Sequence, residues 1–457
     1  MRFDFSDFPF SGKAFSAKPM TFCEPDVTRF FSAIIELAAL ETGNRKAREH
    51  WQTLQLRNLL AHAANRSPFW RRRIGARDGL GGARLSRLPI LARRELREQV
   101  ASEGSLLEPS DRIPVRGHST SGSSGVPVRF FVSEMNANYN VMRSIAQYFL
   151  EGRDLTLNRT QLNYARTPQP RGISVERAGS WLGVLGPFIS GGAAKIITTR
   201  RAEPQSIWRE LSRDPIGYLS AAPRVIETLL QHVGPDEFKR AGAAMLIIVA
   251  EELDASIRSR FAAVGIPTRN TYSCEEVGPI GAECERHPGR YHVATSNVVV
   301  EVDPDDEIRL GEARAGKVLL THLHSYATPF IRYDVGDLAT LEDRCPCGHD
   351  GPTLSNVVGR SKTLLKHRDG HLSQFFVRAR EMMAIAPFDE FRIRQTAEAK
   401  LVVEIGGRES LSAEETAAFI RLMRSHAGDD FDVEVRAVAA IDWGESVKRL
   451  GFHNELL

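Results

Sequence analysis

Several features are scarce or missing in this chain of 457 residues, and each absence excludes a class of protein. No apolar run approaches the roughly 20 residues that a membrane-spanning helix needs. The N-terminus places Asp4, Asp7 and Lys13 among aromatic residues without a continuous apolar core, so no secretory signal is evident. The five cysteines are too few, and odd in number, for a disulfide framework. We therefore expect a cytoplasmic protein with no membrane partner.

An excess of charge of one sign is also missing. The chain has 60 Lys and Arg against 57 Asp and Glu, which gives a formal net charge of +3. Short basic clusters such as Arg71-Arg72-Arg73 are typical of solvated helix faces. Composition therefore argues against a dedicated nucleic-acid-binding protein. The length is sufficient for two or three domains and a large core.

The apolar pattern predicts a helical start followed by a mixed α/β region. Residues 27 to 75 have helical periodicity, with Leu56, Leu59, Leu60 and Ala63 on one face and a break at Ser67-Pro68. Between about residues 110 and 340, short strand candidates alternate with helical segments. The strand candidates are Ala194 to Thr198, Ile216 to Leu219, Met245 to Ala250, Val298 to Val302 and Val318 to Leu323.

The last hundred residues indicate a smaller α+β unit. Phe391 to Arg394 and Leu401 to Ile405 alternate like paired strands. Ser412-Ala413-Glu414-Glu415 is a capping box that opens a helix. Phe431 to Val438 is a further strand candidate, and the hinge before this unit is expected between Gly359 and Thr363.

The most informative stretch is a loop of hydroxyls and glycines that precedes the apolar segment Val128 to Val132. Glycine lets successive backbone N–H groups face one anion, and Ser and Thr hydroxyls add donors around it. Such a loop can hold a polyphosphate, although a short run of this kind is also typical of a flexible turn. Its members are Ser119, Thr120, Ser121, Gly122, Ser123, Ser124 and Gly125.

Four further segments follow the hydroxyl–glycine loop in a fixed order. The first, Ile248 to Glu252, is a strand running into a turn, and in the second, Asn270 to Gly278, Tyr272 and Glu276 lie four residues apart. The third is Thr328 to Leu338, which contains Asp337, and the fourth is Val358 to Lys366. Each alone is compatible with a purely structural role.

Together and in this order, the five segments resemble the core motifs of the adenylate-forming enzymes, the superfamily of acyl-CoA synthetases and related ligases. The likeness is strongest to the phenylacetate–CoA ligase and capsular-polysaccharide-type branch, and it extends from about residue 50 to the C-terminus. Three segments carry this finer resemblance: Leu59-Leu60 to Ser67-Pro68-Phe69-Trp70, Leu88-Pro89-Ile90-Leu91 and Cys345-Pro346-Cys347-Gly348.

The resemblance implies the domain plan and the nucleotide site. An N-terminal α/β domain that binds ATP and the acid is expected over residues 1–358, a hinge over 359–362 and a mobile C-terminal lid over 363–457. The hydroxyl–glycine loop would hold the β- and γ-phosphates, with Thr120 as the main hydroxyl. The remaining expected nucleotide contacts are Glu276 to Mg²⁺, Tyr272 to adenine, Ala250 and Glu251 to the base pocket, Asp337 to the ribose, and Arg360 to the ribose or phosphates.

The resemblance also assigns a mobile catalytic lysine. Lys448 stands where this superfamily keeps its C-terminal lysine, which can enter to neutralise a transition state and then withdraw. Lys366, at the end of the hinge motif, is the nearest competitor. Lys362 replaces the more usual Asp of that motif and can serve as the pivot.

The chain also departs from the family pattern. Val126 and Val128 flank Pro127, where the family often has a lysine, so ATP binding would depend more on backbone N–H groups and hydroxyls. Asp334 and Val335 replace the more usual Arg-Thr pair before Gly336. These changes leave the acceptor of the second half-reaction open.

A structural zinc site is predicted around Cys345 and Cys347. Cys284 lies upstream with His287 and His292 close by, and three thiolates with one imidazole form a closed tetrahedral zinc site. The resemblance favours His292, while the spacing of Cys284 and His287 keeps His287 as the alternative. Cys274 is expected to pack near the nucleotide.

The resulting prediction is an ATP-dependent ligase that forms an acyl-adenylate and passes the acyl group to a thiol. Coenzyme A is the expected acceptor and an aryl or arylacetic acid the expected substrate, with part of its pocket from Trp181 to Ser190; a homodimer is one option for assembly. An amide-forming synthetase, a carrier-protein-loading synthetase and a non-catalytic nucleotide-binding paralogue are the alternatives. A P-loop kinase or NTPase is disfavoured because no Gly-Lys-Ser/Thr follows a glycine loop.

Overall fold

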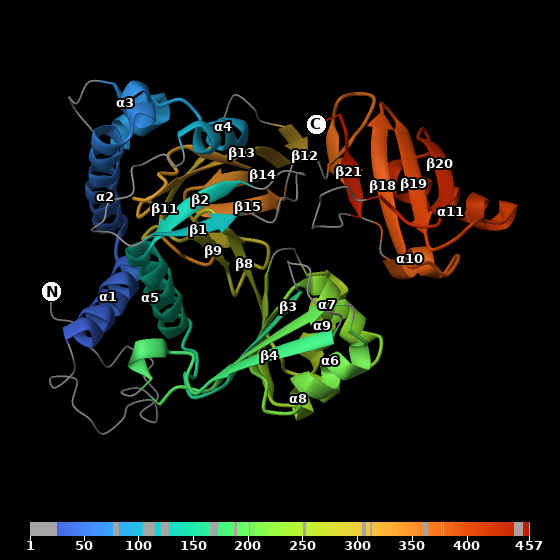
Figure 1. Ribbon diagram of the computed structural model, residues 1–457, viewed down its shortest axis with the longest axis horizontal. Coiled ribbons are helices and arrows are strands. Elements are labelled where there is room, and N and C mark those ends of the chain that lie inside the picture. The colour runs from blue at the N-terminus through green and yellow to red at the C-terminus, as the bar shows by residue number, and fades with distance from the viewer. Residues whose placement is uncertain are drawn as a thin grey trace.

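The computed structural model shows a mixed α/β protein with one long sheet and a separate smaller one (Figure 1). It describes residues 25–75, 82–103, 115–119, 128–164, 172–186, 190–200, 202–249, 253–303, 308–310, 313–359, 364–375, 377, 379–442 and 451–456.

The helical start is confirmed. Helices α1 (Pro25–Thr42), α2 (Arg45–Arg66) and α3 (Pro68–Ile74) follow one another. The apolar face of α2 is buried at Leu56, Leu59, Leu60 and Ala63, as its periodicity predicts. Ser67 ends α2 and its side chain accepts a hydrogen bond from the Trp70 N–H, so this one residue caps α3 as well.

The long sheet has a parallel half covered by helices. Its strands run in the spatial order β8-β7-β6-β3-β5, with β4 added antiparallel at the edge. Helices α6 to α9 pack on this half through a common apolar cluster, and the central strands β6 and β7 are the most deeply buried. The bounds are β3 Arg159–Tyr164, β4 Gly172–Ala178, β5 Ala194–Arg200, α6 Pro204–Leu211, β6 Gly217–Ala221, α7 Pro223–Leu230, α8 Pro235–Arg240, β7 Ala243–Ile248, α9 Ala255–Ala263 and β8 Thr268–Cys274.

The other half of the long sheet is mainly antiparallel, and β8 belongs to both halves. Residues 268–270 pair parallel with β7, whereas residues 271–274 pair antiparallel with β9. The bounds of the remaining strands are β9 Gly278–Glu283, β10 Tyr291–Val293, β11 Val298–Val302, β12 Ile308–Leu310, β13 Ala313–His322, β14 Tyr333–Glu342, β15 Thr353–Val358, β16 Leu364–Lys366 and β17 Leu372–Gln374. The change of partner within β8 places its last four residues at the junction between the two halves.

A separate hairpin and four helical segments complete the description of the large part of the molecule. The hairpin of β1 (Val115–Ser119) and β2 (Arg129–Ser133) leads into α5, and α5 packs on α1. Helix α4 precedes the hairpin and contacts both β2 and β14. The remaining bounds are η3 Gly82–Arg87, α4 Arg93–Glu103, α5 Glu134–Leu150 and η4 Gly183–Leu185.

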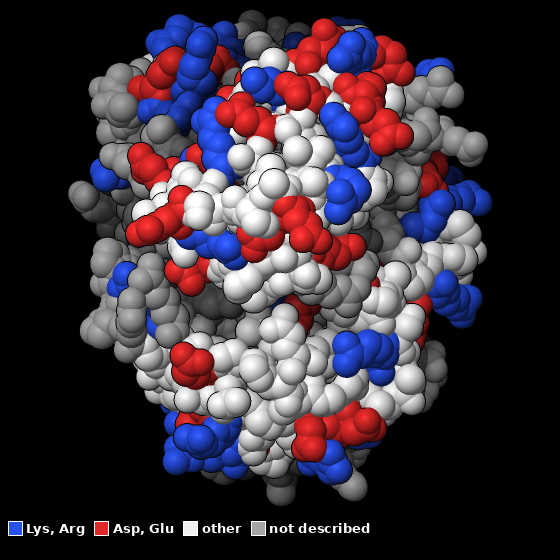
Figure 2. All heavy atoms as spheres, turned by 90° about the vertical axis from the view of Figure 1, so that its right-hand side faces the viewer, with Lys and Arg blue, Asp and Glu red and all other residues white. Residues whose placement is uncertain are grey.

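The C-terminal unit has its own sheet and core, visible at one end of the molecule in Figure 1. The predicted strand pair is confirmed as an antiparallel β18–β19 hairpin, and the capping box at Ser412 opens α11. The bounds are α10 Ala379–Met383, β18 Glu390–Ala397, β19 Lys400–Gly406, α11 Ala413–Ala427, β20 Asp432–Val438 and β21 Phe452–Asn454. Figure 2, which looks at this end of the molecule, shows Lys and Arg interspersed with Asp and Glu.

The segment after the predicted hinge contacts both units. Strand β17 pairs with β12 and so extends the long sheet, while the side chain of Leu365 packs in the core of the C-terminal unit. Leu364 and Leu372 pack instead against Leu338 and Val358 of the large part. The division at residues 359–362 stays a prediction. Among the described residues, no helix is both long and apolar enough to cross a membrane.

Candidate active site

Tyr272 and Asp337 meet although they lie on different strands. Tyr272, near the end of β8, donates a hydrogen bond of 2.8 Å from its hydroxyl to Oδ2 of Asp337 on β14. Burial, followed by the Asp337 carboxylate, raises the pKa of Tyr272 well above its usual value. The phenol therefore stays protonated and acts as the donor. Two of the five sequence motifs thus converge at one point.

The unusual residue Asp334 shapes the turn in front of Asp337. Its Oδ1 accepts a hydrogen bond of 2.8 Å from the N–H of Gly336, an Asx-type contact across two residues. Gly336 has φ of +84°, a conformation in which a side chain would be strained. Asp334 therefore stabilises this turn by accepting a hydrogen bond, which the more usual arginine could not do because its side chain has no acceptor.

The start of the hinge motif lies beside the same carboxylate. A Cβ atom placed on Gly359 would be 4.0 Å from Oδ1 of Asp337. The next residue along the chain, Arg360, was predicted to reach the ribose or phosphates, and it lies outside the described residues. The position of Gly359 nevertheless shows that the start of the fourth motif lies next to Asp337 of the third motif.

Glu276 is buried and held by two partners that the sequence did not indicate. Its Oε1 accepts a hydrogen bond of 2.9 Å from the Tyr333 hydroxyl and lies 3.4 Å from a guanidinium nitrogen of Arg93. Burial and the Glu276 carboxylate raise the pKa of Tyr333, so this phenol also remains a donor. The Glu276 side chain is only 5 % exposed, so its two partners stabilise a carboxylate that would otherwise be poorly solvated.

The positions of Arg93 and Tyr333 are fixed by main-chain contacts. The Leu91 N–H donates to the Arg332 carbonyl at 2.9 Å, and the Asp334 N–H donates to the Leu91 carbonyl at 3.1 Å. These bonds attach the start of α4 to the start of β14. The segment Leu88 to Leu91, noted only as part of a resemblance, thereby places Arg93 next to Glu276.

Cys274 lies near the carboxylates of Glu276 and Asp337 and is not part of the metal cluster described below. Burial, followed by Glu276 and with a smaller contribution from Asp337, raises the pKa of its thiol well above the usual value. A buried thiol that stays protonated is a poor nucleophile. Cys274 therefore acts as a small neutral packing residue.

The β1–β2 hairpin leads to Glu276 through a series of ring contacts. His118 stacks on Phe130 at 5.8 Å, Phe130 meets Phe330 at 5.6 Å, and Phe330 meets Tyr333 at 5.2 Å between ring centroids. Ser119, the first residue of the hydroxyl–glycine loop, pairs with Arg129 at the end of this hairpin. Other site residues predicted from the sequence lie outside the described residues: Thr120, Ser121, Gly122, Ser123, Ser124, Gly125, Ala250, Glu251, Arg360, Lys362 and Lys448.

Comparison with known proteins agrees with this geometry. No family model matches the chain. A phenylacetate–coenzyme A ligase of Thermus thermophilus is 26 % identical over 416 residues, which are 84 % of this chain and 88 % of the relative. The structure of a 2-hydroxyisobutyryl-CoA ligase with a bound acyl-AMP matches over 91 % of both chains with a TM-score of 0.61 and 19 % identity.

The chain shares the fold of these ligases over most of its length. A GH3.15 acyl acid amido synthetase also shares the fold, with a TM-score of 0.53 and 14 % identity over 89 % of this chain and 88 % of that one. The predicted fold class is confirmed by these matches. In the structure, Tyr272 contacts Asp337, and Cys274 lies near both Asp337 and Glu276, so the three motif residues share one region of the molecule.

A second cluster in this protein contains three cysteines and one histidine. Cys284, His292, Cys345 and Cys347 each offer one ligand atom, and these atoms all lie within 4.8 Å of one another. Cys284 and Cys345 place their sulfurs 3.7 Å apart, and the Cys347 sulfur lies 3.3 Å from Nε2 of His292. Zinc–sulfur bonds of about 2.3 Å and zinc–nitrogen bonds of about 2.0 Å separate tetrahedral neighbours by roughly 3.5 to 3.8 Å. The side chains therefore fit a zinc ion.

The structure distinguishes the two histidines that the sequence left open. His292 belongs to the cluster, and its ring stacks on His349 with 4.2 Å between centroids. His287 contributes its carbonyl to the turn by accepting a hydrogen bond of 3.1 Å from the Arg290 N–H. Through this cluster, the loop between β9 and β10 meets the loop between β14 and β15.

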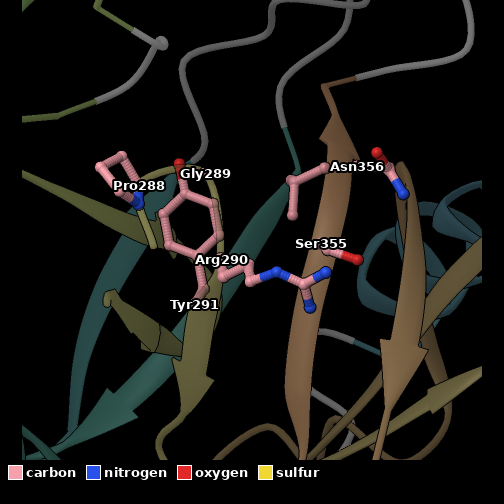
Figure 3. A pocket seen from close by; sticks show the side chains of 7 residues that line it. Pro288, Gly289, Arg290, Tyr291, Ser355 and Asn356 are labelled. Carbon is pink, nitrogen blue, oxygen red and sulfur yellow. The ribbon is translucent and has the colours of Figure 1, made fainter. Parts of the chain in front are cut away.

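A polar pocket of about 300 Å³ lies beside the cysteine cluster (Figure 3). No sequence motif indicated it, because it forms where β10 and β15 stop pairing beyond Tyr291 and Leu354. Arg290 points across it toward Ser355 and pairs with Glu342. The ring of Tyr291 lies 6.1 Å from that of Tyr272, so this wall adjoins the nucleotide motif. The lining residues are Pro288, Gly289, Arg290, Tyr291, Ser355, Asn356 and Val357.

Proposed function

We propose that this protein activates a carboxylic acid with ATP and then transfers the acyl group to the thiol of coenzyme A. The observation that carries this proposal is the contact between Tyr272 and Asp337, which joins two nucleotide motifs of an adenylate-forming fold. The relative from Thermus thermophilus is itself a phenylacetate–coenzyme A ligase. A related structure contains an acyl-AMP together with coenzyme A.

Tyr272 and Asp337 would hold the nucleoside part of ATP. The phenol ring offers a flat apolar face for adenine, while its hydroxyl fixes the orientation of the Asp337 carboxylate. A carboxylate accepts several hydrogen bonds, so Asp337 can keep the Tyr272 donor and accept from ribose hydroxyls as well. The base and the sugar would then be oriented by one rigid pair.

In the first half-reaction, a carboxylate oxygen of the acid attacks the α-phosphorus of ATP. The bond between this phosphorus and the bridging oxygen breaks, and pyrophosphate leaves with both bonding electrons. The products are an acyl-adenylate and pyrophosphate, with no net redox change. For this step the protein must hold the three negatively charged phosphates so that the attacking and leaving oxygens are in line with the α-phosphorus. Residues 119–125, Arg360 and Lys448 are expected to do this.

Glu276 is the residue that would hold Mg²⁺. A carboxylate is the hard oxygen ligand that this ion prefers, and Mg²⁺ at nucleotide sites commonly uses one carboxylate plus phosphates and waters. Both described contacts of Glu276 fall on Oε1, so Oε2 is the oxygen directed to this role. When bound, the ion would neutralise phosphate charge during the displacement.

In the second half-reaction, the thiol sulfur of coenzyme A attacks the acyl carbon. The acyl–oxygen bond to AMP breaks, the thiol proton is lost, and the products are a thioester and AMP. Lys448 would act in the adenylation step and withdraw before this one. Lys362 would serve as the pivot of that domain movement.

The acid is proposed to be an aryl or arylacetic acid. Trp181, Leu182 and Leu185, from the segment first assigned to its pocket, pack in the apolar cluster between α1 and α5. Trp181 also donates from its indole N–H to the Leu157 carbonyl at 2.9 Å. These three side chains are therefore engaged in packing, so the side chains that would contact the acid have to come from other residues.

The cysteine cluster is proposed to bind a structural Zn²⁺. Its four side chains form a closed ligand set, so the ion would have no open position for a substrate. Bound there, it would tie the β9–β10 loop to the β14–β15 loop. The cytoplasmic location and the homodimer remain predictions.

The proposal is tested by product analysis. Purified protein is incubated with ATP, Mg²⁺, coenzyme A and one acid of a panel of aryl, arylacetic and aliphatic acids. We expect equal amounts of AMP and an acyl-CoA thioester with one acid class, and none with Lys448→Ala. Lys366→Ala is the matched control and should retain activity. Formation of ADP, or of an amide when an amine replaces coenzyme A, would contradict the proposed reaction.

A further inference from the structure

Glu283, the last residue of β9, is a buried carboxylate that no nucleotide or metal motif includes. Its side chain is 1 % exposed, and it immediately precedes the metal-cluster residue Cys284. A carboxylate this deeply buried is stable only when its oxygens are fully hydrogen-bonded. Its partners therefore define what the residue holds in place.

Each oxygen of Glu283 accepts one guanidinium N–H and one main-chain N–H. Oε1 accepts from Nη2 of Arg258 at 2.9 Å and from the Gly289 N–H at 2.9 Å. Oε2 accepts from Nη1 of Arg258 at 3.1 Å and from the Asn270 N–H at 2.8 Å. These four bonds are named the Glu283 clamp. Arg258 adds a bond of 2.9 Å to the Thr268 hydroxyl, which ties it to the same strand.

The clamp joins three elements around the proposed nucleotide site. Arg258 belongs to α9, which follows the base-pocket segment at residues 250–251. Asn270 lies on β8 two residues before Tyr272, and Gly289 lies in the β9–β10 loop between Cys284 and His292. A single side chain thus contacts strand β8, helix α9 and the loop that connects the two cluster residues Cys284 and His292.

We propose that Glu283 is a positioning residue that couples the cysteine cluster to nucleotide binding by fixing β8, an inference that rests on the proposed function. The β9–β10 loop is held at its base, where the Cys284 N–H donates to the Arg290 carbonyl at 2.7 Å. Metal bound by Cys284 and His292 would make this loop rigid. The Gly289 N–H then presents a fixed donor to Glu283, and Glu283 in turn fixes the Asn270 main chain and the ring of Tyr272.

The arrangement of the four donors explains why a glutamate is required, because both of its oxygens act only as acceptors. A glutamine at this position would present an NH₂ group where two N–H donors now point at an oxygen. Whichever way its amide is turned, it loses one guanidinium bond and one main-chain bond. A Lys at position 258 could donate to one oxygen only, because an ammonium lacks the planar fork that binds a carboxylate at both oxygens.

The test compares Glu283→Gln and Arg258→Lys with Glu285→Gln. Glu285 lies in the same loop, is 80 % exposed and pairs with Arg269 outside the clamp, so it is the matched control. We expect Glu283→Gln to raise the KM for ATP by about tenfold, with kcat and the KM for the acid within about threefold of the wild type, as remote supporting residues typically act. Zinc content should stay that of the wild type. Glu285→Gln should match the wild type in all four quantities.

A second measurement needs neither activity nor a variant that folds. Hydrogen exchange of the wild type is followed by mass spectrometry before and after removal of zinc with a chelator. We expect faster exchange in residues 268–274 as well as in residues 284–292 after chelation, together with weaker binding of ATP in equilibrium dialysis. Faster exchange confined to the two cysteine loops, with unchanged exchange in β8 and unchanged ATP affinity, would overturn the inference.

The two proposals fail in different ways. If no acid supports adenylate formation in the wild type, the proposed function fails, while the exchange of residues 268–274 still reports on the clamp. If the wild type is active but Glu283→Gln keeps the wild-type KM for ATP, the clamp is only structural. Restoration of part of the ATP affinity by Glu283→Asp, which keeps two carboxylate oxygens, would support the positioning role.

Discussion

The hydroxyl of Tyr272 donates to Oδ2 of Asp337 at 2.8 Å, and this bond joins strands β8 and β14 across 65 residues of sequence. Because β8 leaves β7 and joins β9 immediately before Tyr272, this bond lies at the junction of the two halves of the long sheet. A change at either residue should therefore affect nucleotide binding more than stability.

Tyr272→Phe keeps the ring face and removes only the hydroxyl. Loss of a hydrogen bond to a charged group costs about 1.5 to 3 kcal/mol. Because this bond is made without ATP, only the part of the cost that comes from the lost orientation of Asp337 affects binding, and we expect the KM for ATP to rise by up to about tenfold. Asp337→Ala removes the ribose acceptor as well and should have a larger effect. Steady-state kinetics with ATP varied at saturating acid measures both. An unchanged KM for ATP in Asp337→Ala would contradict the assigned role.

Glu276→Gln removes the negative charge proposed to bind Mg²⁺. We expect kcat to fall by about 100-fold or more, as for loss of a major electrostatic contribution in the transition state, and the Mg²⁺ concentration for half-maximal rate to rise. Tyr333→Phe keeps the carboxylate and removes one neutral donor, so it should change kcat by less than about tenfold. Mg²⁺ titrations of both variants test this. Equal effects of the two substitutions would indicate that Glu276 has a packing role only.

The geometry of the cysteine cluster predicts that the three cysteines bind zinc together with His292 and not with His287. We expect one zinc per chain in the wild type and in His287→Ala, and little zinc in His292→Ala or Cys345→Ser. Loss of a structural zinc site should also lower the free energy of unfolding, because metal binding contributes to folding. Elemental analysis and denaturant unfolding measure the two quantities. Retention of zinc by His292→Ala with loss in His287→Ala would reverse the ligand assignment.

Because His322 and His324 are buried, we expect the free energy of unfolding to decrease in mild acid. Burial, followed by the neighbouring His324, lowers the pKa of His322 to about 3 from an ordinary value of 6.5. Burial lowers the pKa of His324 to about 4. The unfolded chain therefore binds these protons first as the pH falls below 6.5, so their contribution to stability is complete above that pH and is lost toward pH 4.

The size of this effect follows from the two pKa values. Each imidazole can lower the free energy of unfolding by up to about 1.4 kcal/mol for each pH unit below 6.5. Urea unfolding at pH 7, 6 and 5 measures the slope. His322→Leu removes a buried ring whose two nitrogens have no hydrogen-bond partner among the described residues, and it should reduce that slope. A free energy of unfolding that is equal at pH 7 and pH 5 in the wild type would contradict this prediction.

Much of the fold was predictable because its local patterns agree with its tertiary structure. The buried face of α2, the capping box at Ser412 and the β18–β19 pair each follow from spacing within one short segment. The choice between His287 and His292 was not predictable from spacing. It depends on which ring the turn at residues 287–290 directs toward Cys347, and that is a matter of tertiary geometry.

The partners of the site residues were less predictable than the site residues themselves. Arg93 has the sequence character of a solvated helix residue, yet the attachment of Leu91 to β14 places it beside Glu276. Glu283 has no motif, because its four donors come from α9, β8 and the β9–β10 loop. Such residues are recognised only when distant segments are seen together.

Formation of an acyl-adenylate by this protein can be measured as acid-dependent exchange of labelled pyrophosphate into ATP, with Mg²⁺ present and with no coenzyme A or other acceptor. We expect exchange with one class of carboxylic acid, and its loss in Asp337→Ala and Glu276→Gln. An absence of exchange with every acid of an aryl, arylacetic and aliphatic panel, from protein that binds ATP, would contradict this expectation.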